Sequence, residues 1–178
     1  MTSLVGLFGR RFPPGACSDA FTDLRARFEA LTFSAAVERP EGSDLTVDLP
    51  ALAQRLIETL DPDRRHRVAV DGAPARVAAA RADGVCQILG ELTITLFRRG
   101  LGSGGGAAGD ISIRFEQGVL VMRAAAEDPA QAGPGDGHHD LGWSIAEGLA
   151  RNLSGALYRL SEVPLVAEAR IPADALGR

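Results

Sequence analysis

Apolar residues recur every three or four positions in four segments of this chain, a spacing typical of amphipathic helices. The first helix is predicted to begin near Ser18, which can serve as its N-cap, and to end near Glu38. Its narrow apolar stripe consists of Phe21, Leu24, Phe28, Leu31 and Ala35. A stripe of this kind suits pairing with another helix, and it also suits packing on the helix's own domain. The sequence leaves both alternatives open.

Three more helices are predicted further along the chain. One spans residues 48–60, with Asp48 as its N-cap, Pro50 in its first turn and a stop at residues 61–63. A long helix is expected from about Pro74 to Arg99, and the last one spans about 141–153. The strand signals, runs of β-branched and aromatic residues between turn residues, fall at 66–70, 111–115, 119–123, 156–160 and 165–171.

Two segments lack any such periodicity. Residues 100–109 form a glycine-rich connector without the Gly-Lys-Ser/Thr of a phosphate-binding P-loop. Residues 126–139 are rich in Gly, Pro, Asp and Ala and are expected to form a long loop, of the length of a functional lid. The order of elements predicts an α+β fold, a two-layer sandwich with helices on one face of a mixed sheet, preceded by an N-terminal helix. We expect residues 1–42 to be an N-terminal segment with one helix, a candidate dimerisation element, and residues 43–178 to be the domain.

Composition narrows the functional classes. With 178 residues the chain fits one domain, and its net charge of −4 gives no basic face for nucleic acid. Cys17 and Cys86 are too few and too far apart for a disulfide framework or a metal site, and a helical position predicts a buried Cys86. The sequence shows neither a signal peptide nor the roughly 20 apolar residues of a membrane span, so a cytoplasmic location is expected.

Residues 90–99, Gly-Glu-Leu-Thr-Ile-Thr-Leu-Phe-Arg-Arg, carry the most informative pattern. They resemble the N box of the histidine-kinase-like ATPases (the GHKL superfamily), which is roughly Glu-Leu-x-x-Asn-Ala-x-Lys-His. The resemblance implies that Glu91 lies near the γ-phosphate, that Thr95 replaces the asparagine that binds Mg²⁺, and that Arg98 takes the place of the phosphate-contacting lysine. Because a threonine hydroxyl is shorter than an asparagine carbonyl, weak Mg²⁺ binding is expected.

The adenine-binding motif of this family, Asp-x-Gly-x-Gly, is altered. Residues 124–126 are alanines at the predicted strand end, and Asp128 could serve only if the register slips. Losing the acceptor for the adenine amino group costs roughly 1–3 kcal/mol in a buried site. The resemblance therefore implies weak ATP binding at best.

The motif that ends the lid in this family, Gly-x-Gly-Leu-Gly-Leu, is partly kept. Leu141 and Gly142 match its Leu-Gly, whereas His138 and Asp140 replace the two earlier glycines. The resemblance assigns Gly137, Leu141, Gly142 and Ser144 to the nucleotide site. Asp140 can also cap the helix by itself, and its carboxylate would then compete with phosphate for the same amides. The adjacent histidines at 138 and 139 have no third ligand nearby and are expected to be exposed rather than to bind a metal.

The resemblance is closest to the sensor kinases whose phosphoacceptor helix carries His-Arg-x-Lys-Asn. The histidines here are His66, His138 and His139, and none lies on the N-terminal helix. We therefore expect a degenerate domain of bacterial signal transduction: a non-catalytic adaptor for a response regulator or a histidine-containing phosphotransfer protein, with a homodimer formed through the first helix. The alternative is an ATP-dependent histidine kinase that acts in trans on a partner.

Overall fold

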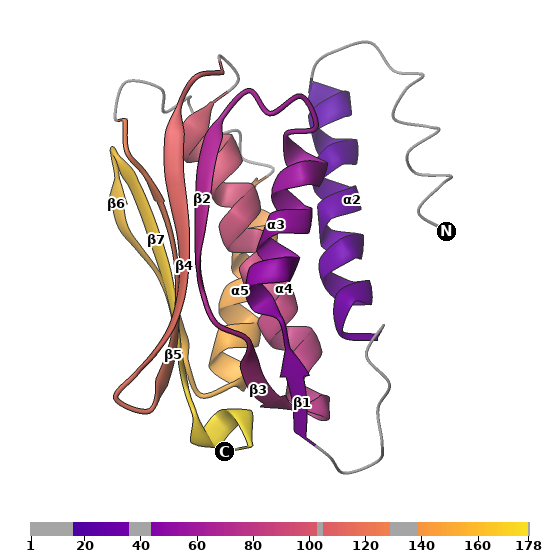
Figure 1. Cartoon of the computed structure of the whole chain (residues 1–178), viewed down its shortest axis with the longest axis vertical. Helices are drawn as coiled ribbons and strands as arrows, with labels where there is room; N and C mark the ends of the chain where they lie inside the picture. The colour runs from indigo at the N-terminus through magenta and orange to yellow at the C-terminus, as the bar shows by residue number, and fades with distance from the viewer. Residues whose placement is uncertain (1–15, 36–43, 103–104, 129–138, 178) are drawn as a thin grey trace.

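The computed structural model describes residues 16–35, 44–102, 105–128 and 139–177. Within these residues a five-stranded sheet is covered on one face by three helices, α3 (Leu49–Leu60), α4 (Ala79–Thr95) and α5 (His139–Asn152). Helix α2 (Ala16–Ala35) lies outside this helical layer, on the side away from the sheet (Figure 1). The predicted α+β sandwich with a preceding helix is confirmed.

The sheet has the strand order β2-β4-β5-β7-β6. Strand β2 (Arg67–Gly72) runs parallel to β4 (Ala108–Glu116), and the other neighbours are antiparallel. The parallel pair requires a crossover, which α4 provides. The last four predicted strands are present and longer than expected, and they form two hairpins: β4 pairs with β5 (Val119–Ala126), and β6 (Ala156–Glu162) pairs with β7 (Leu165–Pro172).

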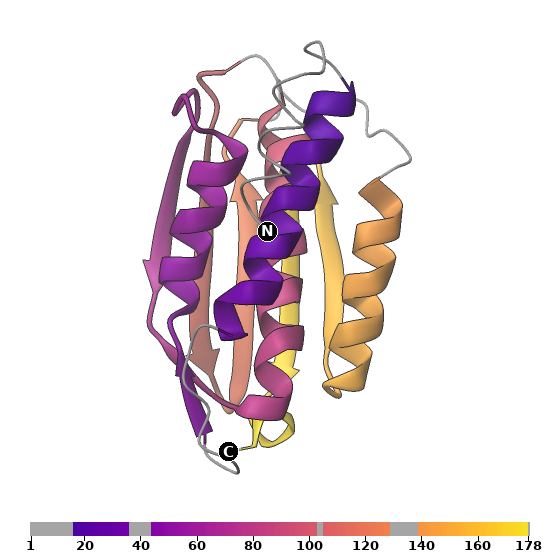
Figure 2. The ribbon, with the colours of Figure 1, turned by 90° about the vertical axis from the view of Figure 1, so that its right-hand side faces the viewer.

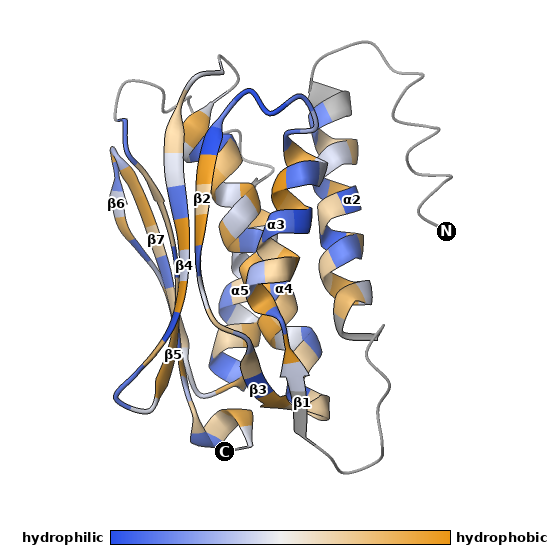
Figure 3. Ribbon diagram, viewed as in Figure 1, coloured by the Kyte–Doolittle hydropathy of each residue, from blue (hydrophilic) through white to orange (hydrophobic). Residues whose placement is uncertain are grey.

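The core lies between the sheet and the helices, where apolar residues of both layers face one another (Figure 3). Asp48 caps α3 as predicted, and its carboxylate accepts the backbone N–H of Ala51 at 2.9 Å. Cys86 is fully buried, also as predicted. Its neighbours on α4 include the largest fully buried side chains of the helix, which are Ile88, Leu89, Leu92 and Ile94.

The prediction of one long helix from Pro74 to Arg99 is wrong at its N-terminal end. Residues 75–78 form strand β3 (Ala75–Ala78), antiparallel to β1 (Asp44–Val47), which the sequence analysis missed. Ala75 and Val77 are buried and Arg76 between them is exposed, so this segment follows the strand period. Helix α4 starts at Ala79, and its C-terminal end passes into a π-helical turn, Leu96–Leu101.

The end of α3 is tied to the start of β2 through a buried carboxylate. Asp61 accepts the backbone N–H groups of Arg65 at 2.9 Å and His66 at 2.8 Å, and its Oδ2 lies 3.1 Å from Nδ1 of His66. The His66 ring meets Phe97 of the π-helical turn edge-on, with centroids 5.7 Å apart. Burial disfavours the charged carboxylate, but the three hydrogen bonds outweigh it and hold the pKa of Asp61 below its ordinary value of 3.8.

The lowered pKa of Asp61 predicts a loss of stability in acid. Because the folded pKa lies below the unfolded one, the ionised carboxylate stabilises the fold above about pH 4, and this contribution disappears as the pH falls through the folded pKa. We expect Asp61→Asn to lower the free energy of unfolding at neutral pH by about 1–3 kcal/mol and to flatten its decline in acid. Urea unfolding between about pH 3 and 7 measures both.

Asp63→Asn is the matched control, because Asp63 is exposed and only pairs with exposed Arg65. Asp63→Asn should change the free energy of unfolding by no more than about 0.5 kcal/mol at any pH in this range. Equal acid slopes for the wild type and Asp61→Asn would contradict this account of Asp61.

Candidate functional site

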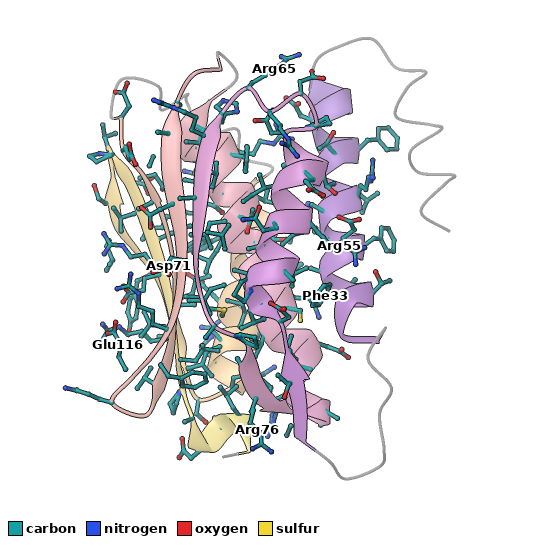
Figure 4. The ribbon with its side chains drawn as sticks, viewed as in Figure 1. Phe33, Arg55, Arg65, Asp71, Arg76 and Glu116 are labelled. Atoms are coloured by element: carbon teal, nitrogen blue, oxygen red, sulfur yellow. The ribbon has the colours of Figure 1, made fainter. Side chains whose placement is uncertain are left out.

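Helix α2 packs antiparallel on α4, and the contact uses small residues. Ala26 and Ala30 of α2 are buried, and a Cβ on Gly90 of α4 would come within 3.0 Å of the Cβ of Ala30. Helix α2 also contacts α3, where Arg55 stacks over the ring of Phe33 at 5.6 Å (Figure 4). The close approach brings α2 onto the α4 residues that the sequence assigned to a nucleotide site.

Glu91 is paired with an arginine of α2. Arg27 donates from Nε to Oε1 of Glu91 at 2.5 Å and from Nη2 to Oε2 at 3.0 Å, a bidentate geometry. Only 9% of the Glu91 side chain is exposed, against 33% for Arg27. The hydrogen bond to Glu91 raises the pKa of the Arg27 guanidinium, burial opposes this, and the charges of Glu91 and Asp23 reinforce it. The two hydrogen bonds satisfy the carboxylate of Glu91 and two of the donors of Arg27.

Arg98 is paired with the same helix. Its Nε and Nη2 donate to one carboxylate oxygen of Asp23 at 2.8 and 2.7 Å, and the Asp23 side chain is only 4% exposed. Arg98 also lies 3.2 Å from the carboxylate of Asp19. Asp19, Asp23 and Arg27 are four residues apart and so share one face of α2. This face binds two of the three charged residues of the N-box-like segment, Glu91 and Arg98.

Gly142 closes the site from the side of α5. A Cβ at this position would collide with the Glu91 carboxylate and with the Arg27 guanidinium, and would lie 2.8 Å from Cδ of Glu91. The glycine that matches the family's lid motif therefore accommodates an ion pair between two protein side chains. Thr95, one turn beyond Glu91 on α4, is buried as well.

The other predicted site residues lie outside this cluster or outside the described residues. Leu141 is 70% exposed, and Ser144 is exposed on the same helix. Strand β5 continues through Ala126, so alanines occupy the strand end, and exposed Asp128 follows two residues later. Gly137 and His138, together with the side chains of His139 and Asp140, are not among the described parts of the chain.

Trp143, which stands where the family motif has leucine, is buried. Its indole N–H donates to Glu147 at 2.8 Å, and the Arg159 guanidinium lies over the ring at 4.4 Å. The bond to Glu147 stays within α5 and satisfies the indole N–H, whereas the Arg159 contact links α5 to β6.

Asp19, Asp23 and Arg27 were not predicted. Their spacing of four residues is present in the sequence, but the prediction for this helix rested on its apolar stripe. Which residues they would meet depends on how α2 crosses α4, and no local pattern gives that crossing.

The architecture resembles known structures. The histidine kinase domain of the blue-light activated histidine kinase from Erythrobacter litoralis matches with a TM-score of 0.64 at 15% identity, covering 98% of this chain and 96% of that one. The chain has the fold of the histidine-kinase-like ATPases. The kinase AdeS of Acinetobacter baumannii matches with a TM-score of 0.55 at 15% identity over 96% of this chain and 91% of its own.

This histidine-kinase-like domain also matches the catalytic domain of the histidine kinase ThkA, with a TM-score of 0.53 at 12% identity over 74% of this chain and 96% of that domain. It spans 58% of a longer chain of the blue-light kinase. No protein-family model matches the sequence, and no curated protein matches it either. At these identities the comparisons show the fold.

The residues of this histidine-kinase-like domain do not fit Mg²⁺·ATP in the observed arrangement. The Glu91 carboxylate is occupied by a guanidinium, whose positive charge disfavours a nearby cation. Arg98 is neutralised by two carboxylates. Among the described residues, no group of three His, Cys, Asp or Glu side chains could hold a metal ion, and no helix is long and apolar enough to cross a bilayer.

Two glycines of α5 provide a test of this packing. We expect Gly142→Ala to lower the free energy of unfolding by about 1–3 kcal/mol, because the new methyl group collides with the Arg27–Glu91 pair. Gly148→Ala, on the same helix with nothing within 4 Å of its Cβ position, should raise it by about 0.5–1 kcal/mol. Thermal and urea unfolding of both variants measure the difference. Equal effects would show that Gly142 is not packed against the pair.

Proposed function

We propose that this protein is a non-catalytic adaptor of bacterial two-component signalling, in which the N-box-like helix binds the protein's own N-terminal helix. The observation that supports this best is the bidentate Arg27–Glu91 pair packed against Gly142. In a kinase-type ATPase the equivalent glutamate has to be available near the γ-phosphate. Here the same carboxylate holds α2 in place.

The free energy needed to separate Glu91 and Arg98 from α2 disfavours nucleotide binding at these residues. A nucleotide that used Glu91 and Arg98 would have to separate both from α2, leaving partly buried charges without partners. If opening costs about 3 kcal/mol, the apparent affinity for nucleotide falls roughly a hundredfold. Thr95 in place of asparagine and alanines at the end of β5 weaken binding further.

The partner we propose is a response regulator or a histidine-containing phosphotransfer protein. Phosphotransfer by this chain itself is disfavoured because α2 contains no histidine, and the His66 side chain is only 7% exposed. Binding without phosphoryl transfer then remains as the role of the domain.

A second candidate function is an ATP-dependent histidine kinase that acts in trans. The presence of Glu91, Arg98 and Gly142 at matching positions favours it. In that case α2 would leave α4 when ATP and Mg²⁺ bind.

Calorimetric titration with ATP and ADP, with and without Mg²⁺, separates the two functions. For the adaptor we expect no binding tighter than about 1 mM in the wild type. Arg27→Met should still bind no tighter than about 1 mM, because the Arg98–Asp23 pair and the Thr95 and β5 changes remain. Arg25→Met, two residues away and exposed, is the control. Micromolar, Mg²⁺-dependent binding by the wild type would overturn the adaptor proposal and favour the kinase.

A further inference from the structure

A pocket lies where the end of α3 meets the start of β2, away from Gly142 and α5. In Figure 2 α3 and β2 lie at one edge of the domain and α5 lies at the other. The pocket has a volume of about 290 Å³, and its polar lining residues are Gln54, Glu58, Asp61, Arg64, His66 and Arg67. This volume is at the lower end of the range for ligand pockets, so an occupant has to be small.

His66 contributes a buried acceptor without a donor. Its side chain is only 7% exposed, and its Nε2 is buried and makes no hydrogen bond with the described residues. The carboxylate of Asp61, which is ionised at neutral pH, lies 3.1 Å from Nδ1 and accepts the hydrogen of that nitrogen. The neutral imidazole therefore carries its lone pair on Nε2. Because buried polar atoms are nearly always hydrogen-bonded, this acceptor indicates a donor from outside the chain.

Two guanidinium groups at the pocket lack a counter-ion. Arg64 and Arg67 are exposed, and within the described parts of the chain neither side chain forms an ion pair or a hydrogen bond. Arg65 between them pairs instead with Asp63 at 2.9 Å and does not line the pocket. Because guanidinium groups bind oxyanions through pairs of N–H···O bonds, the two free arginines indicate an anionic occupant.

A phosphate group meets both requirements. Its unprotonated oxygens can accept hydrogen bonds from Arg64 and Arg67, and its O–H can donate to Nε2 of His66. A carboxylate or a sulfate is fully deprotonated at neutral pH and offers no donor to this nitrogen. The negative charges of Glu58 and Asp61 also line the pocket and balance the two arginines, so we expect weak binding.

We propose that the pocket between α3 and β2 binds a phosphate group, either free phosphate or a small phosphate monoester, and that His66 selects an oxyanion that carries a proton. Arg64 and Arg67 bind the charged oxygens. Asp61 is a positioning residue, because it fixes the tautomer of His66. Neither Glu91 nor Arg98 lines this pocket, so the proposal is independent of the adaptor function.

A comparison of phosphate with sulfate tests the proposal. The full chain is titrated at about pH 8, where an ordinary imidazole is neutral, at constant ionic strength and without Mg²⁺, and NMR follows the backbone amides of residues 61–68. We expect a dissociation constant of about 1 mM for phosphate and at least about tenfold weaker binding of sulfate, which leaves Nε2 without a donor. Titration with glycerol 3-phosphate distinguishes the sources: binding of the ester as well as of free phosphate identifies a small monoester as a ligand, and its exclusion identifies free phosphate.

Substitutions at the pocket test the role of each side chain. Arg67→Met should weaken phosphate binding at least about tenfold, and Arg65→Met is the matched control, which should bind like the wild type. His66→Phe keeps an aromatic ring beside Phe97 and should abolish the preference for phosphate over sulfate. Glu58→Gln should tighten phosphate binding about threefold, because it removes a like charge.

Three results would overturn the proposal. They are equal affinities of the wild type for phosphate and sulfate, no phosphate binding below about 20 mM, and unchanged binding in Arg67→Met. Circular dichroism checks that the variants are folded, and Arg67→Met stays informative if His66→Phe does not fold, because Arg67 is exposed. Glu91 and Arg98 are intact in every variant, so failure here leaves the adaptor function untouched.

Discussion

The ion pair between Arg27 and Glu91 determines how the N-terminal helix and the domain fit together. It is bidentate, mostly buried, and placed where α2, α4 and α5 meet. Buried charges of this kind are stable only as a pair, because either one alone would keep the desolvation penalty without the attraction. The second pair, Arg98 with Asp23, sets the position of α2 along α4, since two contacts fix a helix axis better than one.

Much of the fold could be predicted from the sequence because its signals are local. The α3 cap at Asp48 and the two hairpins follow from short-range rules of periodicity and turn chemistry. Strands β1 and β3 have four residues each, and β3 continues directly into α4. Because alanines, which favour helices, lie at this junction, the sequence did not indicate where the strand ends and the helix begins. The sequence could also rank Glu91 and Gly142 as site residues, but what they contact depends on a tertiary crossing that no local pattern encodes.

The two faces of α2 have different tasks in this structure. Its small and charged residues hold the helix on its own domain, whereas its large apolar residues remain at the surface beside α5. The apolar stripe of this helix predicted either packing within the chain or pairing with another helix. The structure shows packing within the chain, and the contact uses the small and charged residues of the helix rather than the stripe.

Gly142 and Glu91 also bear on how such sequences are classified. The pair joins positions 64 residues apart, and neither Arg27 nor Glu91 can change alone without leaving a partly buried charge unpaired beside Gly142. A glutamate at the N-box position can therefore serve the folding of the domain without any role in phosphoryl transfer. Where an arginine on the preceding helix is matched to it, the motif glutamate alone is therefore no evidence of catalysis.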